Sequence, residues 1–404
     1  IDEKGRVYSG HNGGDTRGFH YVQGASYRKG FEKHGVLANP YSFGFFEAMK
    51  SNKLQRFSHT WVLNEADGLP AKYRGNIFAV EPLQGRVMLS EVSADRSSFQ
   101  TKDLGPVVAS SDTWFRPVFL HTGPDGAMYV ADFYREIIET PLSLPDDIKA
   151  KWNLNSRERG RIWRVKARGQ ERAKATPPAS QTTEELISLL GSPTRWQRNT
   201  ALRLIMEKTL TLEQWQRVQV VTHASHYLEA WGLLAMQESL PDSVLTKLLS
   251  STSSVAHQLF GLQQCERLLS VEKLFHTLNL LALSPSEQVR YQFALSLGSM
   301  SLSPARKAGI FSRLCNQQMD TWMESALLSS TSGMELNMLN SLLDSSSHDD
   351  LHHSMISTTF MVRLARLVRQ RVPIATLLQD KSLSKSISEA WSLRHVAALR
   401  RPLQ

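Results

Sequence analysis

The sequence has few cysteines and no long apolar run. Its two cysteines, Cys265 and Cys315, are too few for a disulfide framework, and their apolar surroundings suit buried free thiols. No C-x-x-C, H-E-x-x-H or C-x-x-C-H string occurs, so zinc and covalent haem sites of these kinds are not indicated. No uninterrupted apolar run approaches the roughly 18 residues that a membrane helix needs.

The N-terminus lacks a leader. The chain opens on Ile1, without an initiator Met and without a charged segment followed by an apolar one. We therefore expect it to begin downstream of a signal peptide.

The positive charge is unevenly distributed. The formal net charge is +9, and the stretch from Arg157 to Lys174 alone holds eight basic and two acidic residues. Much of the remaining excess lies in C-terminal arginines. Because these clusters are not interleaved with stacking aromatics in a known nucleic-acid module, we interpret them as solvated faces and predict no nucleic-acid partner.

The first ~170 residues contain short β-type runs separated by turn dipeptides. These runs cover residues 5–10, 75–81, 85–91, 118–122, 127–132 and 160–165. Strands joined by tight turns, such as the Asp-Gly turn at Asp125, predict a meandering antiparallel sheet of the kind found in propeller blades. Two to three blades fit into residues 1–168, whereas a propeller takes about four to eight. We therefore predict the C-terminal blades of a partial β-propeller, with the missing blades before Ile1.

The pattern changes from Glu184 onward, where apolar residues recur at helical spacing. Taking Trp196, Tyr227, Val255, Val289 and Trp322 as anchors gives steps of 31, 28, 34 and 33 residues. A near-constant step of this size is typical of paired helices stacked in a solenoid. We predict HEAT-like helical repeats over 184–404, joined to the propeller by a basic linker at 169–183.

Several strings together suggest a family. They lie at residues 10–18, 73–78, 114–118, 123–132 and 159–164. They resemble the planctomycete-type membrane-bound dehydrogenase and haem-binding proteins. Those proteins carry a quinoprotein sugar-dehydrogenase-like propeller, then HEAT-type repeats and usually a cytochrome c domain.

The resemblance implies a fragment of a secreted quinoprotein-like sugar or polyol dehydrogenase. It implies pyrroloquinoline quinone (PQQ) with calcium as cofactor, and a carbohydrate or polyol substrate. It also implies a periplasmic or extracellular location and association with a membrane surface. Electrons would pass to a cytochrome c domain or protein outside this chain, since haem is not encoded here. The helical repeats would offer a surface to a protein partner.

Five residues are candidates for such a site. Arg116 leads into a predicted innermost strand, and the resemblance implies that an arginine there approaches the quinone; a guanidinium suits this because it binds oxygens bidentately. His11 and His20 are candidates for the base that takes the alcohol proton. Arg17 and Asp132 complete the predicted cofactor contacts.

Each candidate also has a structural explanation. Arg116 could form an ion pair between blades, and the polar Gly-rich loop with His11 and Arg17 could be an ordinary turn. Asp132 could pin a neighbouring segment by accepting backbone N–H groups, which we favour. Asp125 is expected to serve its turn rather than a metal. The second hypothesis is accordingly a non-catalytic scaffold that binds carbohydrate or protein.

One further cluster has the composition of a metal site. The run His348 to His353 would place two histidines on one helix face. A polar helix start explains the run as well, and we predict no metal there.

Overall fold

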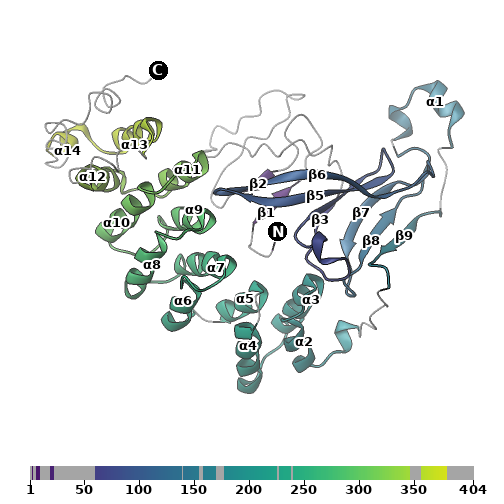
Figure 1. Cartoon of the computed structure of the whole chain (residues 1–404), viewed down its shortest axis with the longest axis horizontal. Coiled ribbons are helices and arrows are strands. Elements are labelled where there is room, and N and C mark those ends of the chain that lie inside the picture. The colour runs from purple at the N-terminus through teal and green to yellow at the C-terminus, as the bar shows by residue number, and fades with distance from the viewer. Residues whose placement is uncertain are drawn as a thin grey trace.

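The chain folds into two parts that differ in secondary structure (Figure 1). The computed structural model describes residues 2, 6–9, 19–21, 60–138, 140–153, 158–169, 177–224, 227–237, 240–345 and 356–379. Up to Val165 these residues form mainly strands, and from Thr183 onward they form helices. The change from strands to helices coincides with the point in the sequence where glycine becomes sparse and apolar residues take up helical spacing.

The described strands form three antiparallel sheets. They are β1 (Val7–Ser9), β2 (Phe19–Tyr21), β3 (Trp61–Leu63), β4 (Ile77–Glu81), β5 (Arg86–Asp95), β6 (Ser98–Ala109), β7 (Pro117–Thr122), β8 (Met128–Asp132) and β9 (Arg161–Val165). β1 pairs with β2, the second sheet has the order β3-β4-β5-β6, and the third has the order β7-β8-β9. Short connections include η2 (Ala71–Tyr73), η3 (Pro141–Ser143) and the helix α1 (Asp146–Lys151).

The four-stranded and three-stranded sheets pack face to face through an apolar core. Alternate side chains of a strand point to the same face, so Phe78 and Val80 of β4 enter this core together. The core consists of Leu69, Phe78, Val80, Val87, Leu89, Leu120, Met128 and Val130. Burying each large side chain contributes roughly 1.5–3 kcal/mol. This packing fixes the position of every loop between the two sheets.

The propeller prediction for residues 1–168 is wrong. The described strands form a four-stranded and a three-stranded sheet that pack on each other, beside the small β1–β2 pair, and the described residues show no ring of blades. Tight turns specify which strands pair, but the packing of one sheet on the next depends on side chains that strand spacing does not reveal. β5 and β6 are also 10 and 12 residues long, well beyond the short runs expected.

Helices make up the second part. They are α2 (Thr183–Leu189), α3 (Arg195–Met206), α4 (Leu212–Ala224), α5 (Leu228–Gln237), α6 (Asp242–Leu248), α7 (Val255–Cys265), α8 (Phe275–Leu281), α9 (Glu287–Ser296), α10 (Pro304–Cys315), α11 (Thr321–Ser329), α12 (Glu335–Ser345), α13 (Thr358–Arg371) and α14 (Ile374–Gln379). The turns η4 (Pro178–Ser180) and η5 (Glu272–Leu274) precede α2 and α8.

The helices form a curved array of two layers (Figure 1). From α3 to α13 the odd-numbered helices contact one another in succession along the inner layer, which faces the strands. The even-numbered helices form the outer layer. Contact mainly between neighbouring pairs is the organisation of a helical solenoid.

The predicted helix step matches this array. Trp196, Val255, Val289 and Trp322 lie in the inner helices α3, α7, α9 and α11, and Tyr227 directly precedes α5. One step along the sequence is therefore one helix pair. The predicted buried thiols are also confirmed, since Cys265 and Cys315 are both buried in the array.

A long hairpin connects the two parts at a distance from their junction in the chain. β5 and β6 extend beyond their sheet toward α9 and α11 (Figure 1). At the tip, the Ser97 N–H donates to Asp320 Oδ2 at 3.1 Å. Arg96 Nε lies 3.6 Å from Glu287 Oε2. The hairpin thus spans from the packed sheets to the middle of the helical array.

Candidate functional site

The structure places only part of the predicted dehydrogenase site. His11 and Arg17 lie outside the described residues. His20 lies in β2 opposite Tyr8, but its side chain is not described. Convergence of these residues with Arg116 therefore stays a prediction.

Arg116 and Asp132 do lie together, at the ends of β7 and β8. The Arg116 N–H donates to Asp132 Oδ1 at 2.8 Å, and the Tyr134 N–H donates to the same oxygen at 2.9 Å. Asp132 Oδ2 accepts from Arg161 Nη2 at 3.0 Å and from Trp163 Nε1 at 3.1 Å. The fully buried Asp132 carboxylate thus joins three segments of the sheet.

The Arg116 guanidinium holds backbone rather than facing an open site. Its Nη1 donates to the Pro82 and Leu83 carbonyls at 3.2 and 3.3 Å, and its Nη2 donates to the Glu136 carbonyl at 2.7 Å. Both terminal nitrogens are therefore committed to carbonyls. These contacts favour the structural explanation of Arg116 and Asp132, and their part in quinone binding stays a prediction.

Aromatic rings cover this cluster. The Arg161 guanidinium lies 3.5 Å from the Tyr134 ring centroid and 4.9 Å from that of Trp163. Trp114 packs against Tyr134 at 5.5 Å between ring centroids. Cation–π contacts of this kind hold a guanidinium in place where it also pairs with carboxylates. The cluster closes one end of the three-stranded sheet.

Asp125 serves its turn, as the sequence predicts. Asp125 Oδ1 accepts from the Ala127 N–H at 3.2 Å, while Oδ2 accepts from Tyr129 Oη at 3.0 Å and from Arg164 Nε at 2.7 Å. Burial raises the pKa of this carboxyl, but the hydrogen bonds from Arg164, Ala127 and Tyr129 outweigh burial and leave the pKa below its ordinary value. The carboxylate therefore ties β9 to the β7–β8 turn.

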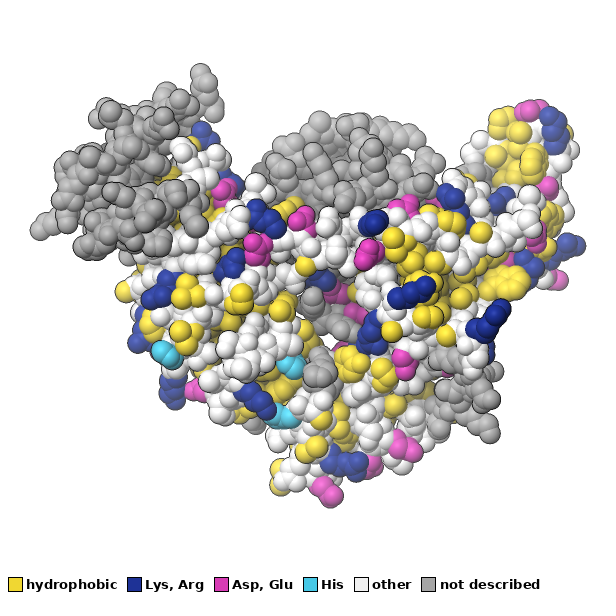
Figure 2. Space-filling view, viewed as in Figure 1, with side chains coloured by type: hydrophobic (Ala, Val, Ile, Leu, Met, Phe, Trp, Pro, Cys, Tyr) yellow, Lys and Arg dark blue, Asp and Glu magenta, His cyan; other side chains and the backbone are white. Residues whose placement is uncertain are grey.

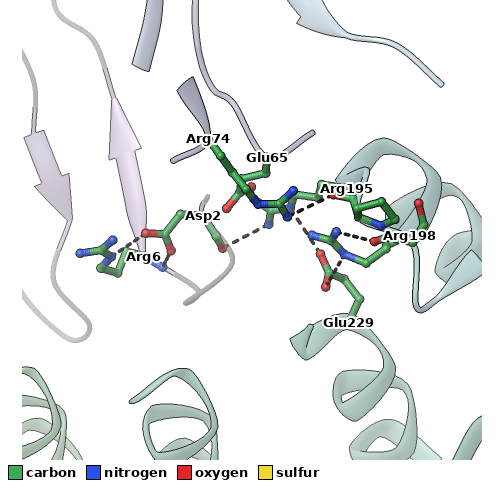
Figure 3. A network of polar contacts seen from close by, with 9 residues as sticks. Asp2, Arg6, Glu65, Arg74, Arg195, Arg198 and Glu229 are labelled. Atoms are coloured by element: carbon green, nitrogen blue, oxygen red, sulfur yellow. Dashed lines mark hydrogen bonds and ion pairs between the residues drawn. The ribbon is translucent and has the colours of Figure 1, made fainter. Parts of the chain in front are cut away.

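A second polar cluster joins the sheets to the first inner helix (Figure 3). Arg195 begins α3. Its N–H donates to the Glu65 carbonyl at 2.9 Å, and its guanidinium pairs with the Glu65 carboxylate. Arg195 Nη2 also donates to the Asp2 carbonyl at 3.2 Å. One arginine therefore contacts the N-terminal segment, the sheet part and the helical array.

Arg198 lies one turn further along α3 and is completely buried. Its Nε is 3.0 Å from Glu229 Oε2, and its Nη1 donates to the Ser192 carbonyl at 2.8 Å. The guanidinium also lies 3.7 Å from the Tyr227 ring centroid. Arg74 Nη2, from the sheet part, reaches Tyr227 Oη at 3.3 Å. A buried ion pair costs desolvation, which such close additional contacts offset.

Close backbone approach tightens the same junction. Thr194 Oγ1 donates to Asp67 Oδ1 at 2.6 Å, and Gln197 Nε2 donates to the Pro124 carbonyl at 2.7 Å. Beside them, a Cβ at Gly68 would lie 2.1 Å from the Gly126 carbonyl carbon. Only glycine at position 68 allows the loops to meet this closely.

The hairpin tip is the second attachment. Asp320 caps α11 by accepting from the Met323 N–H at 2.7 Å, and its other oxygen accepts from Ser97. Arg96 has a φ of 52°, which is uncommon for a residue with a side chain. The strained tip residue is held by the contact with Glu287.

The N-terminal segment contacts both parts near these attachments. Asp2 and Arg6 contribute to the same region, with Arg6 Nε donating to Asp2 Oδ2 at 2.5 Å and the Arg6 guanidinium 5.4 Å from the Phe99 ring centroid. The N-terminal segment thus packs between β6 and α3.

The described residues contain no group of three His, Cys, Asp or Glu side chains placed to hold a metal ion, and the run from His348 to His353 lies outside them. None of the described helices combines the length and apolarity that crossing a membrane requires.

Sequence reasoning missed the junction arginines. Arg195 and Arg198 occupy polar positions of an amphipathic helix, which predicts solvent exposure. Arg195 pairs with Glu65, 130 residues earlier in the chain, and Arg198 pairs with Glu229 of the next inner helix. The available signal was the clustering of two arginines in the first turn of α3, where the helix dipole disfavours cations, so they need carboxylate partners.

Comparison with known proteins gives one match. Residues 2–169 match the model of a domain of unknown function, DUF7133. No curated protein and no solved structure matches the chain.

Proposed function

We propose that the chain is a rigid binding scaffold for a protein or carbohydrate partner. The observation that carries this proposal is the double attachment of the sheet part to the helical array. One attachment runs from Glu65 and Asp67 to Thr194 and Arg195, and the other runs from the hairpin tip to Asp320.

Two separate attachments fix the relative orientation of the parts. A single contact would leave a hinge, whereas contacts on two separate elements restrict rotation about either one. A rigid, concave helical array beside a sheet presents an extended preformed surface, which lowers the ordering cost of binding. The junction uses the largely buried Glu65 carboxylate and Arg195 guanidinium, so loosening it exposes charge.

The dehydrogenase hypothesis stays a prediction that rests on residues outside the described part. The two candidates that are described, Arg116 and Asp132, have their polar groups bound to backbone and to Arg161. These contacts support a structural role for both residues within this chain.

The decisive experiment measures quinone binding and turnover by the full chain. PQQ and calcium are added, quinone binding is measured by calorimetry, and dye reduction is followed with a panel of sugars and polyols. A scaffold gives no saturable quinone binding and no sugar-dependent reduction. Saturable binding together with turnover would overturn the proposal.

A screen for ligands complements the quinone assay. The chain is screened on a glycan array and against displayed peptides, and hits are retested with the variant Glu65→Ala, which weakens the junction. The scaffold proposal expects saturable binding that is weaker in the variant. If no ligand binds, or if binding is unaffected by the junction, rigid presentation is wrong.

A further inference from the structure

The strand β9 forms an open edge of the three-stranded sheet. It pairs with β8 from Met128↔Val165 to Asp132↔Arg161, and no other described strand pairs with it. In an antiparallel sheet every second residue directs its N–H and C=O away from its partner. β9 therefore presents a row of backbone donors and acceptors suited to another strand.

The side chains of this edge are apolar and exposed. Ile162 is 75% exposed and Trp163 is 45% exposed. The register places Ile162 in line with Ala131 and Phe119, and Phe119 is also 49% exposed. The outer face at β9 is thus an apolar row that runs across three strands to the open edge. Figure 2 shows apolar and basic side chains interspersed over this part of the molecule.

The two packed sheets are unequal. The sheet of β3 to β6 has four strands, whereas the sheet that packs against it ends at β9 with three. Natural edge strands are usually protected by charge, proline, a bulge or a covering segment. The sequence Arg161–Val165 contains no proline, and no register shift interrupts its pairing. One further strand beside β9 would bring the second sheet to four strands.

Charge indicates the kind of strand that fits. Between Glu158 and Gly169 there are five basic side chains and one acidic one. Arg161 and Arg164 are paired with Asp132 and Asp125, whereas Arg168 is exposed just beyond the strand. A second copy of β9 would bring two such basic edges together, which like-charge repulsion disfavours. An acidic strand is complementary.

We propose that β9 receives an extended acidic segment of a partner protein as a fourth strand. Backbone hydrogen bonds to β9 would supply affinity, and alternate β-branched side chains would cover Ile162 and Phe119. Acidic side chains would meet the basic residues around the strand. This inference rests on the proposed scaffold function and names one of its binding edges and the chemistry of the partner there.

The test uses designed peptides on the full chain. The probe is an eight-residue peptide in which Glu alternates with Val, and the charge control has Lys in place of Glu. Binding is measured by fluorescence anisotropy, and hydrogen exchange of residues 158–169 locates it. The Glu–Val peptide is expected to bind and to slow exchange in β9, while the Lys–Val peptide does neither.

Two variants control for position. Ile162→Glu places a negative charge on the edge and is expected to weaken binding of the Glu–Val peptide roughly tenfold. Leu212→Glu changes a leucine that is 77% exposed in the helical array and is expected to leave binding unchanged. Comparable thermal unfolding of both variants confirms that they fold.

Two outcomes would overturn the inference. One is equal binding of the two peptides, and the other is absence of protection in β9 at millimolar Glu–Val peptide. Either failure leaves the quinone and turnover assay untouched, so a wrong partner edge is distinguishable from a wrong function.

Discussion

Arg198 shows how a charge is accommodated in the interior of this protein. Its guanidinium is fully buried but has the Glu229 carboxylate, the Ser192 carbonyl and the Tyr227 ring within contact distance. The cost of removing one partner from such a pair exceeds the net contribution of the pair itself, because the other charge stays buried.

Arg198→Ala is therefore expected to lower the free energy of unfolding by roughly 3 kcal/mol. The measurement is urea unfolding followed by circular dichroism. Replacing both partners with apolar residues, as Arg198→Met with Glu229→Leu, should recover most of the loss. Arg203→Ala, which breaks an exposed pair with Glu207, serves as the control and should change stability by about 0.5 kcal/mol or less. A double variant as unstable as the single one would contradict this account.

Asp125 predicts a pH dependence. Its pKa lies below the ordinary value of 3.8 in the folded protein, so its stabilising contribution is fully present above that value and is lost as the pH falls through the folded pKa. We expect Asp125→Asn to be less stable at neutral pH and to lose less stability on acidification. Urea unfolding between about pH 2 and pH 5 measures this slope. Asp146→Asn, at a highly exposed carboxylate, should retain the wild-type slope.

For single residues, the sequence predicted a role where the interaction joins residues close together in the chain. The turn role of Asp125 follows from its Asp-Gly neighbourhood and is confirmed. The burial of Arg198 was not predictable, because it depends on Tyr227 and Glu229 from the next helix pair and on the covering sheet part. The two arginines in the first turn of α3 indicate a need for carboxylate partners, but they do not show which residues supply them.

Among the elements, the hairpin of β5 and β6 depends most on a remote contact. Its tip is held by Asp320, which also caps α11. Loss of the side chain therefore removes a helix cap and a tertiary attachment together.

Asp320→Ala is expected to cost about 1–2 kcal/mol of stability, as loss of an N-cap does. It should also speed hydrogen exchange in the hairpin around Ser97. Ser254→Ala removes the cap of α7, where Ser254 Oγ accepts from the His257 N–H at 3.3 Å, without touching the hairpin. Faster exchange at the tip in both variants would mean that general destabilisation, and not the attachment, is responsible.

The sequence predicted most elements but not the second strand of the hairpin. The strands at 75–81, 118–122, 127–132 and 160–165 are confirmed as β4, β7, β8 and β9, and the strand at 85–91 is confirmed as the first part of β5. β6 was missed because Ser98–Ala109 contains Lys, Asp, Gly and Pro, which are depleted in strands. Its turn at Arg96 and Ser97 also lacks the glycine or asparagine that usually marks a hairpin.

For the whole molecule, the helix step was readable and the arrangement of the sheets was not. A helical repeat gives the sequence a regular spacing of apolar residues, because each helix pair packs on its neighbours in the same way. The face-to-face packing of two sheets leaves no such spacing, since Leu120 and Phe78 come together in one core only once the chain is folded. The attachments between the parts are likewise invisible, because each joins residues more than a hundred positions apart.

The junction is expected to make the two parts unfold together. Glu65→Ala should separate the single calorimetric transition into two, since it leaves Arg195 without its closest carboxylate.

Cys265 and Cys315 report on opening of the helical array, because burial raises the pKa of Cys265 to about 12 and that of Cys315 well above its ordinary value. Their labelling by a thiol reagent at pH 8 should follow opening of the array. Arg306→Ala, within the array, should weaken stability but preserve one transition.

The hairpin has a mechanical consequence. In a helical array each helix pair contacts mainly its neighbouring pairs. Small rotations of one pair against the next therefore add up along the array and change its curvature. Here the sheet part is attached to the start of α3, and its hairpin reaches across the concave side of the array to α9 and α11. Curvature is thereby fixed between the two fastenings. Elastic motion is confined to the helices beyond α11, and a load applied at the C-terminal end of the array would be transmitted through Asp320 into the sheets.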